Sequence, residues 1–147
     1  MSQPTFYVFL AVVVQVLLTL ALVWYQGIIR VRMVSRGEVN VRDVALNPDK
    51  WPERERKVAH ALADQFQLPI LFYIVCMAAV SMGADLLDVV LAWGFVIARL
   101  IHLAVYVTDS NVVRRFWAYS IGLGVLTIFW LVLSFRFIIA ALLFGMR

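Results

Sequence analysis

Arg99, His102 and Tyr106 are polar side chains within residues 86–107, a stretch that is otherwise almost entirely apolar. As a helix rising 1.5 Å per residue, this stretch is long enough to cross the hydrocarbon core of a bilayer. The spacing i, i+3 and i+7 places the three side chains on one helical face. A charge at membrane depth costs several kcal/mol unless protein or water surrounds it. We therefore expect this face to point into a bundle.

A second polar stripe precedes this one in the chain. His60, Asp64 and Gln67 are spaced i, i+4 and i+7, so one helix would carry all three on one face. Consecutive membrane helices run in opposite directions, which brings the two stripes to the same side of the membrane. A carboxylate in a low-dielectric bundle needs a cation or hydrogen bonds. Arg99 or Arg115 is therefore the expected partner of Asp64.

These residues favour an anion-binding pocket. Arg115 and Tyr119 follow the second stripe, and together the cations, the phenols and the imidazole would hold a carboxylate-bearing or phosphorylated amphiphile. An arginine beside a bound thiol would also lower the pKa of that thiol. The alternative is a polar lock that fixes helix register without chemistry. A metal site is not expected, because His60 and His102 have only Asp64 near them as a further ligand.

The composition is that of an integral membrane protein. Hydrophobic residues make up 64% of the 147 residues, against about 45–50% in soluble domains. The sequence predicts an all-α, four-helix membrane bundle in a single domain, residues 1–147. The expected helices cover about residues 5–29, 53–82, 85–107 and 112–145, with one long polar connection at about residues 30–52.

Four residues carry local expectations. Pro69 is expected to kink the second helix, because proline removes one main-chain hydrogen bond. Asp85 is expected to cap the third helix. Gln15 is expected to make a hydrogen bond between helices, and Arg136 is expected to extend along the fourth helix to the outer membrane interface.

The placement of charge predicts the topology. The first and third connections and their flanks contain most of the basic residues: Arg30, Arg32, Arg36, Arg42, Lys50, Arg54, Arg56, Lys57, Arg114 and Arg115. The opposite side carries Arg147, Asp85 and Asp88. By the positive-inside rule, connections one and three are cytoplasmic and both termini lie outside. The basic residues suit membrane lipids as partners, and nothing in their pattern indicates nucleic acid.

Three stretches together carry a family resemblance. Residues 29–39 form a basic exit from the first helix, residues 63–73 are similar to an Asn-x-Phe-Glu-Leu-Pro-x-Leu-Phe-Tyr signature, and residues 98–106 contain Arg-x-x-His-x-x-x-Tyr. These stretches resemble bacterial members of the MAPEG family, the membrane-associated proteins in eicosanoid and glutathione metabolism. The third motif is shared with the microsomal prostaglandin E synthase branch of that family.

The resemblance implies a homotrimer in the bacterial inner membrane, with glutathione as cofactor between subunits and a lipophilic small molecule as substrate. Carried over by position, it implies a site lined by Arg99, His102, Tyr106, Arg115 and Tyr119, and the polar stripe of His60, Asp64 and Gln67 completes the set of candidate cofactor-binding residues. Arg115 would hold or activate the thiolate, and Tyr106 is the second catalytic candidate. Asp64 stands where the signature has Asn and Gln67 where it has Glu. His60 and Ala63 stand where the eicosanoid branch has arginines.

Three functions remain open on the sequence. The first is a glutathione-dependent transferase or peroxidase acting on lipophilic electrophiles. The second is a non-catalytic membrane scaffold or lipid-binding protein of the same fold. The third is a small transporter, which is less favoured because Asp64, Asp85 and Asp88 lie towards helix ends rather than deep in a span.

Overall fold

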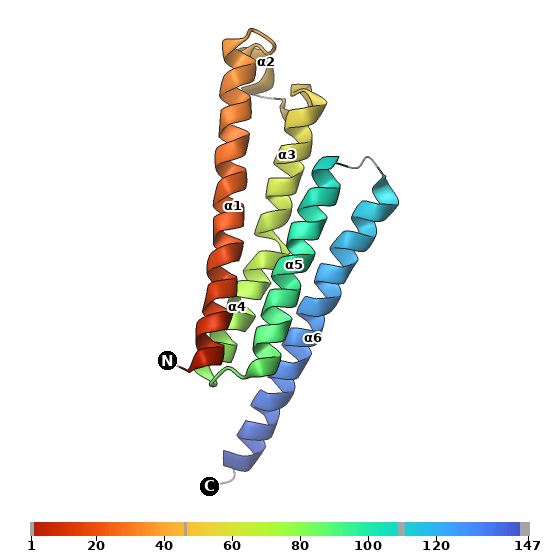
Figure 1. Ribbon diagram of the computed structural model, residues 1–147. Coiled ribbons are helices and arrows are strands. Elements are labelled where there is room, and N and C mark those ends of the chain that lie inside the picture. Colours follow the sequence, from red (N-terminus) through yellow and green to blue (C-terminus); the bar gives the residue numbers. More distant parts are fainter. Residues whose placement is uncertain (1, 46, 109–110, 145–147) are drawn as a thin grey trace.

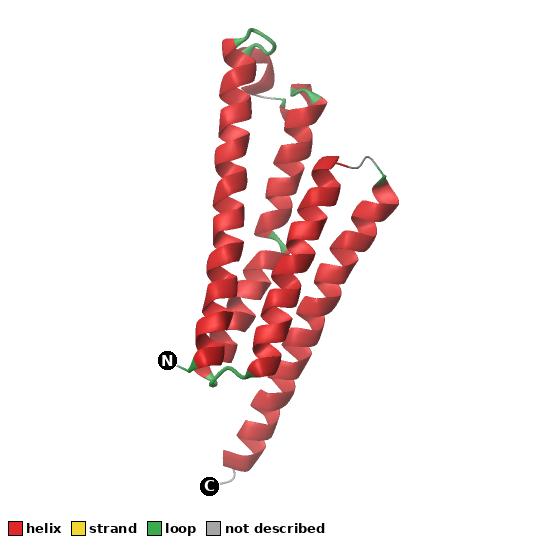
Figure 2. Ribbon diagram, viewed as in Figure 1, coloured by secondary structure: helices red, strands yellow, loops and turns green. Residues whose placement is uncertain are grey.

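The computed structural model describes residues 2–45, 47–108 and 111–144, which form a bundle of long helices (Figure 1). No strand occurs within these ranges (Figure 2). The elements, in chain order, are α1 (Gln3–Ser35), α2 (Val41–Ala45), η1 (Pro48–Lys50), α3 (Glu53–Ala63), η2 (Asp64–Phe66), α4 (Leu68–Ser81), α5 (Leu86–Thr108) and α6 (Val112–Phe144).

Four segments of the described chain are long and apolar enough to cross a membrane. They are α1, the combined segment Glu53–Ser81, and the greater parts of α5 and α6. Both termini lie at the end of the bundle that holds the turn between α4 and α5 (Figure 1). The connections that follow α1 and α5 lie at the opposite end. Residues 109–110 of the predicted turn and Arg147 lie outside the described residues.

The apolar core lies where α4, α5 and α6 pack together and α1 covers them. Phe72 of α4 stacks on Phe95 of α5 with ring centroids 4.5 Å apart, and Phe129 of α6 is fully buried in the same cluster. The buried residues of α1 recur every three to seven positions along one face, from Val8 to Met33. Most large apolar side chains on the other faces are exposed, as expected for surfaces that face lipid.

The second membrane segment is not one continuous helix. A 3₁₀ turn at Asp64–Phe66 separates α3 from α4, and Gln67 has the non-helical angles φ −101° and ψ −92°. Pro69 follows in the first turn of α4. Proline has no N–H and its ring crowds the carbonyl four residues earlier, so a regular helix does not continue through it. The expected kink at Pro69 is therefore a full interruption that begins one turn before the proline.

Two buried polar contacts join α1 to the second segment. Gln15 donates from Nε2 to Oε1 of Gln65 at 2.8 Å, and both side chains are buried, which confirms the hydrogen bond expected for Gln15. Glu55 accepts from Nε2 of Gln26 at 3.0 Å and from Nε of Arg30 at 2.6 Å. Because helices in lipid gain little from apolar contact with each other, such hydrogen bonds help to fix their register.

Arg136 binds two carboxylates at the start of α5, and its expected reach to the outer membrane interface stays a prediction. Its guanidinium binds Asp85 at 2.9 Å and also binds Asp88, at the start of α5. The two aspartates also bond each other's main-chain N–H groups, at 3.0 and 3.1 Å, which confirms Asp85 as the cap of the helix. Asp88 is completely buried, and a buried carboxylate requires a cation close by.

Replacing Arg136 by methionine should destabilise the protein by about 3–5 kcal/mol, because Asp88 would remain buried without a cation. The double variant Arg136→Met with Asp88→Leu should recover most of that loss. Unfolding of the detergent-solubilised protein measures both effects. As a control, Lys57→Met breaks the Lys57–Glu53 pair, where Glu53 is 73% exposed, and should cost less than about 1 kcal/mol. Additive single effects at Arg136 and Asp88 would contradict the pairing.

Candidate functional site

The candidate site is built around the interruption of the second membrane segment. Arg99 of α5 donates from Nη2 to the main-chain oxygen of Asp64 at 3.1 Å. A continuous helix would use that carbonyl internally, whereas the 3₁₀ turn leaves it available. Arg99 is only 1% exposed, so its cation is fully enclosed by protein. The break therefore determines where this buried arginine binds.

The expected side-chain pair between Asp64 and an arginine is not formed among the described residues. The Asp64 carboxylate lies instead 3.3 Å from Nε2 of His102, one helical turn beyond Arg99. Arg99 and His102 thus both contact Asp64, one through the main chain and the other through the side chain. Arg99 is engaged by the main-chain oxygen of Asp64, so His102 rather than Arg99 lies against the carboxylate.

Aromatic rings enclose His102. Tyr106 of α5 and Tyr119 of α6 place their ring centroids 5.8 and 5.7 Å from the imidazole. The guanidinium of Arg115 lies 4.8 Å from the centroid of the Tyr106 ring, within the range of a cation–π contact. Side chains from η2, α5 and α6 thus form one polar cluster, and Arg115 lies at its edge.

Several buried nitrogens in this cluster have no hydrogen-bond partner among the described atoms. They are Nε and Nη1 of Arg99 and Nδ1 of His102. Unsatisfied buried donors are uncommon in proteins and call for a specific explanation, such as water or a ligand. Guanidinium groups are well suited to carboxylates, since their N–H groups match both oxygens. The arrangement can therefore bind an anion, with an imidazole next to it that Asp64 orients.

Six of the eight predicted site residues meet in this polar cluster: Asp64, Arg99, His102, Tyr106, Arg115 and Tyr119. His60 and Gln67 do not join them within the chain, since both are exposed on the second segment. The interruption at Gln67 explains part of this, because it removes that residue from the face shared by His60 and Asp64. Among the described residues, no group of three metal-ligating side chains is present.

Sequence reasoning missed Gln65, which lies within the interruption and holds it to α1 through Gln15. Its neighbours His60, Asp64 and Gln67 attracted attention by their spacing, and Gln65 falls outside that pattern. The available signal was Gln15, an amide deep in an apolar helix that needed a buried polar partner. Glu55 was missed for a similar reason, because it lies among exposed charged residues on α3.

A family model described as the MAPEG family matches residues 8–135, which includes the site and all four membrane-length segments. No curated protein and no solved structure gives a significant match. The family match confirms the resemblance carried by the three sequence stretches.

Thermodynamic coupling should be stronger between Asp64 and His102 than between Asp64 and Arg99. Asp64→Asn keeps the main-chain oxygen that Arg99 uses but removes the carboxylate beside His102. We expect a coupling of about 1–2 kcal/mol between Asp64→Asn and His102→Phe, and a smaller value between Asp64→Asn and Arg99→Met. Unfolding of the single and double variants in detergent gives both values. The reverse order would indicate a direct carboxylate–guanidinium pair.

Proposed function

The chain belongs to the MAPEG family, a family of membrane proteins of glutathione and eicosanoid metabolism, and we propose that it binds glutathione and transfers it to lipophilic electrophiles. Family membership and the four apolar segments make it an integral, multi-pass membrane protein. The glutathione site proposed here is the polar cluster of Asp64, Arg99, His102, Tyr106, Arg115 and Tyr119.

One observation carries the proposal. Arg99 is enclosed by protein at the level of a membrane-spanning segment, and two of its three guanidinium nitrogens have no partner among the described atoms. A buried cation is costly unless it is compensated, and its contact with a neutral carbonyl compensates it only in part. A carboxylate of a bound peptide would supply the missing acceptors. A polar lock that binds no ligand would be more stable with these donors paired within the protein, since unpaired buried donors are costly.

The donor set fits glutathione, an anionic tripeptide with two carboxylates, an ammonium and a thiol. Arg99 and Arg115 would bind the carboxylates, and Asp64 would accept from the ammonium. Asp64 also replaces the Asn of the family signature, so it adds an acceptor at the position where an amide otherwise stands. His60 and Gln67, which are exposed within one chain, would complete the site from a neighbouring copy.

When bound, glutathione supplies a thiol that becomes the nucleophile. Arg115 lies at the edge of the cluster, where its positive charge would favour the thiolate form of a nearby sulfur. His102, oriented by Asp64, would take up the thiol proton at a ring nitrogen. The Tyr106 phenol would donate a hydrogen bond to the charge that develops on the electrophile. The new bond would join sulfur to an electrophilic carbon as that carbon's π bond or its bond to a leaving atom breaks, and the proton held by His102 would pass to the atom that takes the released electron pair.

We also propose that the protein is a homotrimer in the bacterial inner membrane. The connections after α1 and α5 would face the cytoplasm, since they and their flanks contain most of the basic residues, and both termini would face outward. The exposed polar side chains of His60 and Gln67 support an assembled state, because lipid is a poor environment for either.

A non-catalytic scaffold of the same fold is the second candidate. It is favoured by the contacts that Asp64 makes with Arg99 and His102, which close the helix interruption without any ligand. The two functions differ at Arg115, whose only described contact in the cluster is with the Tyr106 ring. Replacing Arg115 should have little effect on a scaffold, but it should strongly weaken ligand binding at a thiol site.

Calorimetric titration of the detergent-solubilised protein with glutathione should show saturable binding. Arg115→Ala should weaken that binding by at least ten-fold, because a charge-assisted contact contributes about 1.5–3 kcal/mol. Arg42→Ala is the matched control, since Arg42 is an exposed arginine of α2 away from the cluster, and it should leave the affinity unchanged. No binding at millimolar glutathione by a folded, oligomeric protein would favour the scaffold.

Native mass spectrometry should give a mass of three chains in a mild detergent. Replacing Gln67 by leucine removes a polar group that is exposed in the single chain, and it should weaken glutathione binding if a neighbouring copy shares the site. The same variant should preserve secondary structure, which circular dichroism can check. A monomeric wild-type protein that still binds glutathione would contradict the shared site.

A further inference from the structure

The proposed function gives no role to a buried pair of amides next to the polar cluster. Gln15 of α1 is 0% exposed and Gln65 of η2 is 2% exposed. Their one hydrogen bond leaves Oε1 of Gln15 and Nε2 of Gln65 without partners among the described atoms. Two leucines in the same space would leave no polar atom unpaired, so stability alone does not explain the amides.

Gln65 and Asp64 are neighbours in one 3₁₀ turn, and their side chains bind different helices. A 3₁₀ helix has three residues per turn, so consecutive side chains leave it about 120° apart. Gln65 is held by Gln15 of α1, whereas the Asp64 carboxylate lies 3.3 Å from Nε2 of His102 on α5. Rotation of the turn about its own axis would therefore change both contacts together.

Two hydrogen bonds fix the turn within the bundle. Arg99 holds one point, the main-chain oxygen of Asp64, at 3.1 Å. A single point leaves the turn free to rotate, and the bond from Gln15 to Gln65 adds a second point on another helix. The contact between Asp64 and His102 tolerates little rotation, because 3.3 Å is already long for a hydrogen bond.

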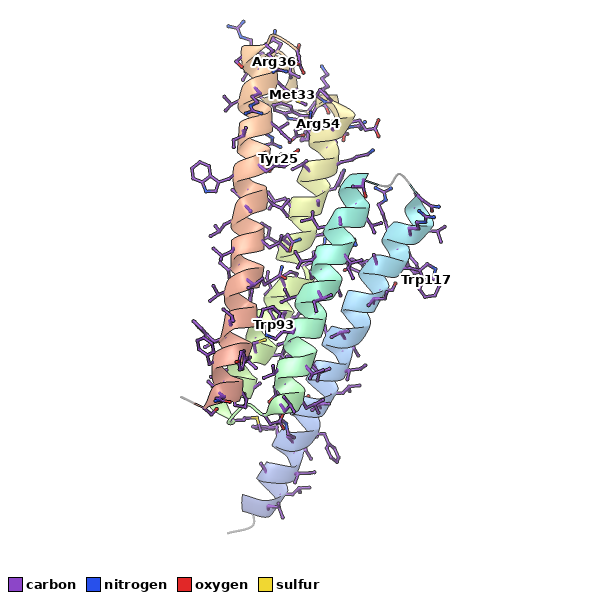
Figure 3. All side chains as sticks on the ribbon, viewed as in Figure 1. Tyr25, Met33, Arg36, Arg54, Trp93 and Trp117 are labelled. Atoms are coloured by element: carbon purple, nitrogen blue, oxygen red, sulfur yellow. The ribbon has the colours of Figure 1, made fainter. Side chains whose placement is uncertain are left out.

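Gln15 is a fixed reference for the turn because α1 is bonded to its neighbours elsewhere. Trp93 of α5 donates from Nε1 to the main-chain oxygen of Tyr7 at 3.2 Å, and Figure 3 labels Trp93 where α5 lies beside α1. Towards the other end, Gln26 donates to Glu55 of α3. Removing the Gln15 amide would thus release the turn without releasing α1 from the bundle.

The contact with Asp64 determines which nitrogen of His102 carries the proton. An ionised carboxylate only accepts hydrogen bonds, so Nε2 is the protonated nitrogen in this contact. In the neutral imidazole, the lone pair then belongs to Nδ1, which is buried and has no partner among the described atoms. The cluster therefore presents one unpaired acceptor, Nδ1, one helical turn from the two unpaired donors of Arg99.

We propose that Gln15, acting through Gln65, is a positioning residue that holds His102 in the tautomer with Nε2 protonated and Nδ1 free. Gln15 fixes the rotation of the turn, the turn directs Asp64 to Nε2, and Asp64 selects the tautomer. The use of Nδ1 rests on the proposed function: Nδ1 takes the thiol proton, and the electron pair of the S–H bond stays on sulfur. The tautomer itself does not depend on that function.

Nitrogen-15 NMR of the full-length protein in detergent, at a pH where the imidazole is neutral, measures the tautomer. The chain has two histidines, so spectra of the histidine-labelled wild type and of His60→Gln assign the ring signals of His102. Ring shifts distinguish a protonated from an unprotonated nitrogen, and the wild type should have its proton mainly on Nε2. Gln15→Leu should lower the ratio of the Nε2–H to the Nδ1–H tautomer about ten-fold, because the ring loses a charge-assisted hydrogen bond.

Gln26→Leu is the matched control. Gln26 is also a buried amide of α1 that bonds the second segment, but its partner Glu55 lies in α3, away from the interruption. This variant should leave the tautomer ratio of His102 unchanged. The double variant Gln15→Leu with Gln65→Leu leaves no amide unpaired, so it should keep the fold and give the same low ratio as Gln15→Leu.

Three results would overturn the proposal. The first is a wild-type His102 with its proton on Nδ1. The second is an unchanged ratio in Gln15→Leu and in the double variant, which would make the amide pair a structural contact only. The third is an equal change with Gln15→Leu and Gln26→Leu, which would indicate a general loosening of α1. All spectra are recorded without glutathione, so a failure to bind glutathione would count against the proposed function and not against this role of Gln15.

Discussion

The second membrane segment is interrupted at residues 64–67, and the main-chain groups there lose their helical hydrogen bonds. The stability of the bundle depends on the side chains that replace those bonds. Within a bilayer, an unpaired carbonyl has no water to bond, so a broken helix persists only where protein supplies donors. Arg99 supplies one to the carbonyl of Asp64. Gln15 anchors the side chain of Gln65 in the same turn. The break is therefore held from two sides, by α5 and by α1, and it requires a buried cation at this depth.

The same logic explains why polar pairs recur between helices. Apolar side chains pack equally well on lipid and on each other, so they do little to select a helix register. The Asp88–Arg136 pair joins α5 to α6 at the end of the bundle that holds the turn between α4 and α5, and Glu55 joins α3 to α1 towards the opposite end. The polar cluster lies between these two pairs along the bundle. Each helix is thus tied to a neighbour by a contact that would be costly to break in lipid.

The sequence was sufficient for the four membrane-length segments, because their apolar runs are long and their ends carry charges or turn residues. It was also sufficient to place Arg99, His102 and Tyr106 on one face, since α5 is a regular helix, and six of the eight predicted residues lie together in the polar cluster. It could not identify the partner of Asp64, because spacing along an ideal helix does not describe a 3₁₀ turn. Arg136 shows another limit, since its partners lie about fifty residues away in the chain.

The charges within the polar cluster define what each arginine can do. Arg99 meets Asp64 only through the main-chain oxygen, and the Asp64 carboxylate lies against His102. Arg99 therefore serves the fold first, and any substitution of it changes the helix interruption as well as the site. Arg115 lies over the Tyr106 ring and supplies the surplus positive charge. An anionic ligand would depend on Arg115 for net attraction and on Arg99 for orientation. A substitution of Arg115 would therefore change ligand binding alone, whereas a substitution of Arg99 would change both binding and the fold.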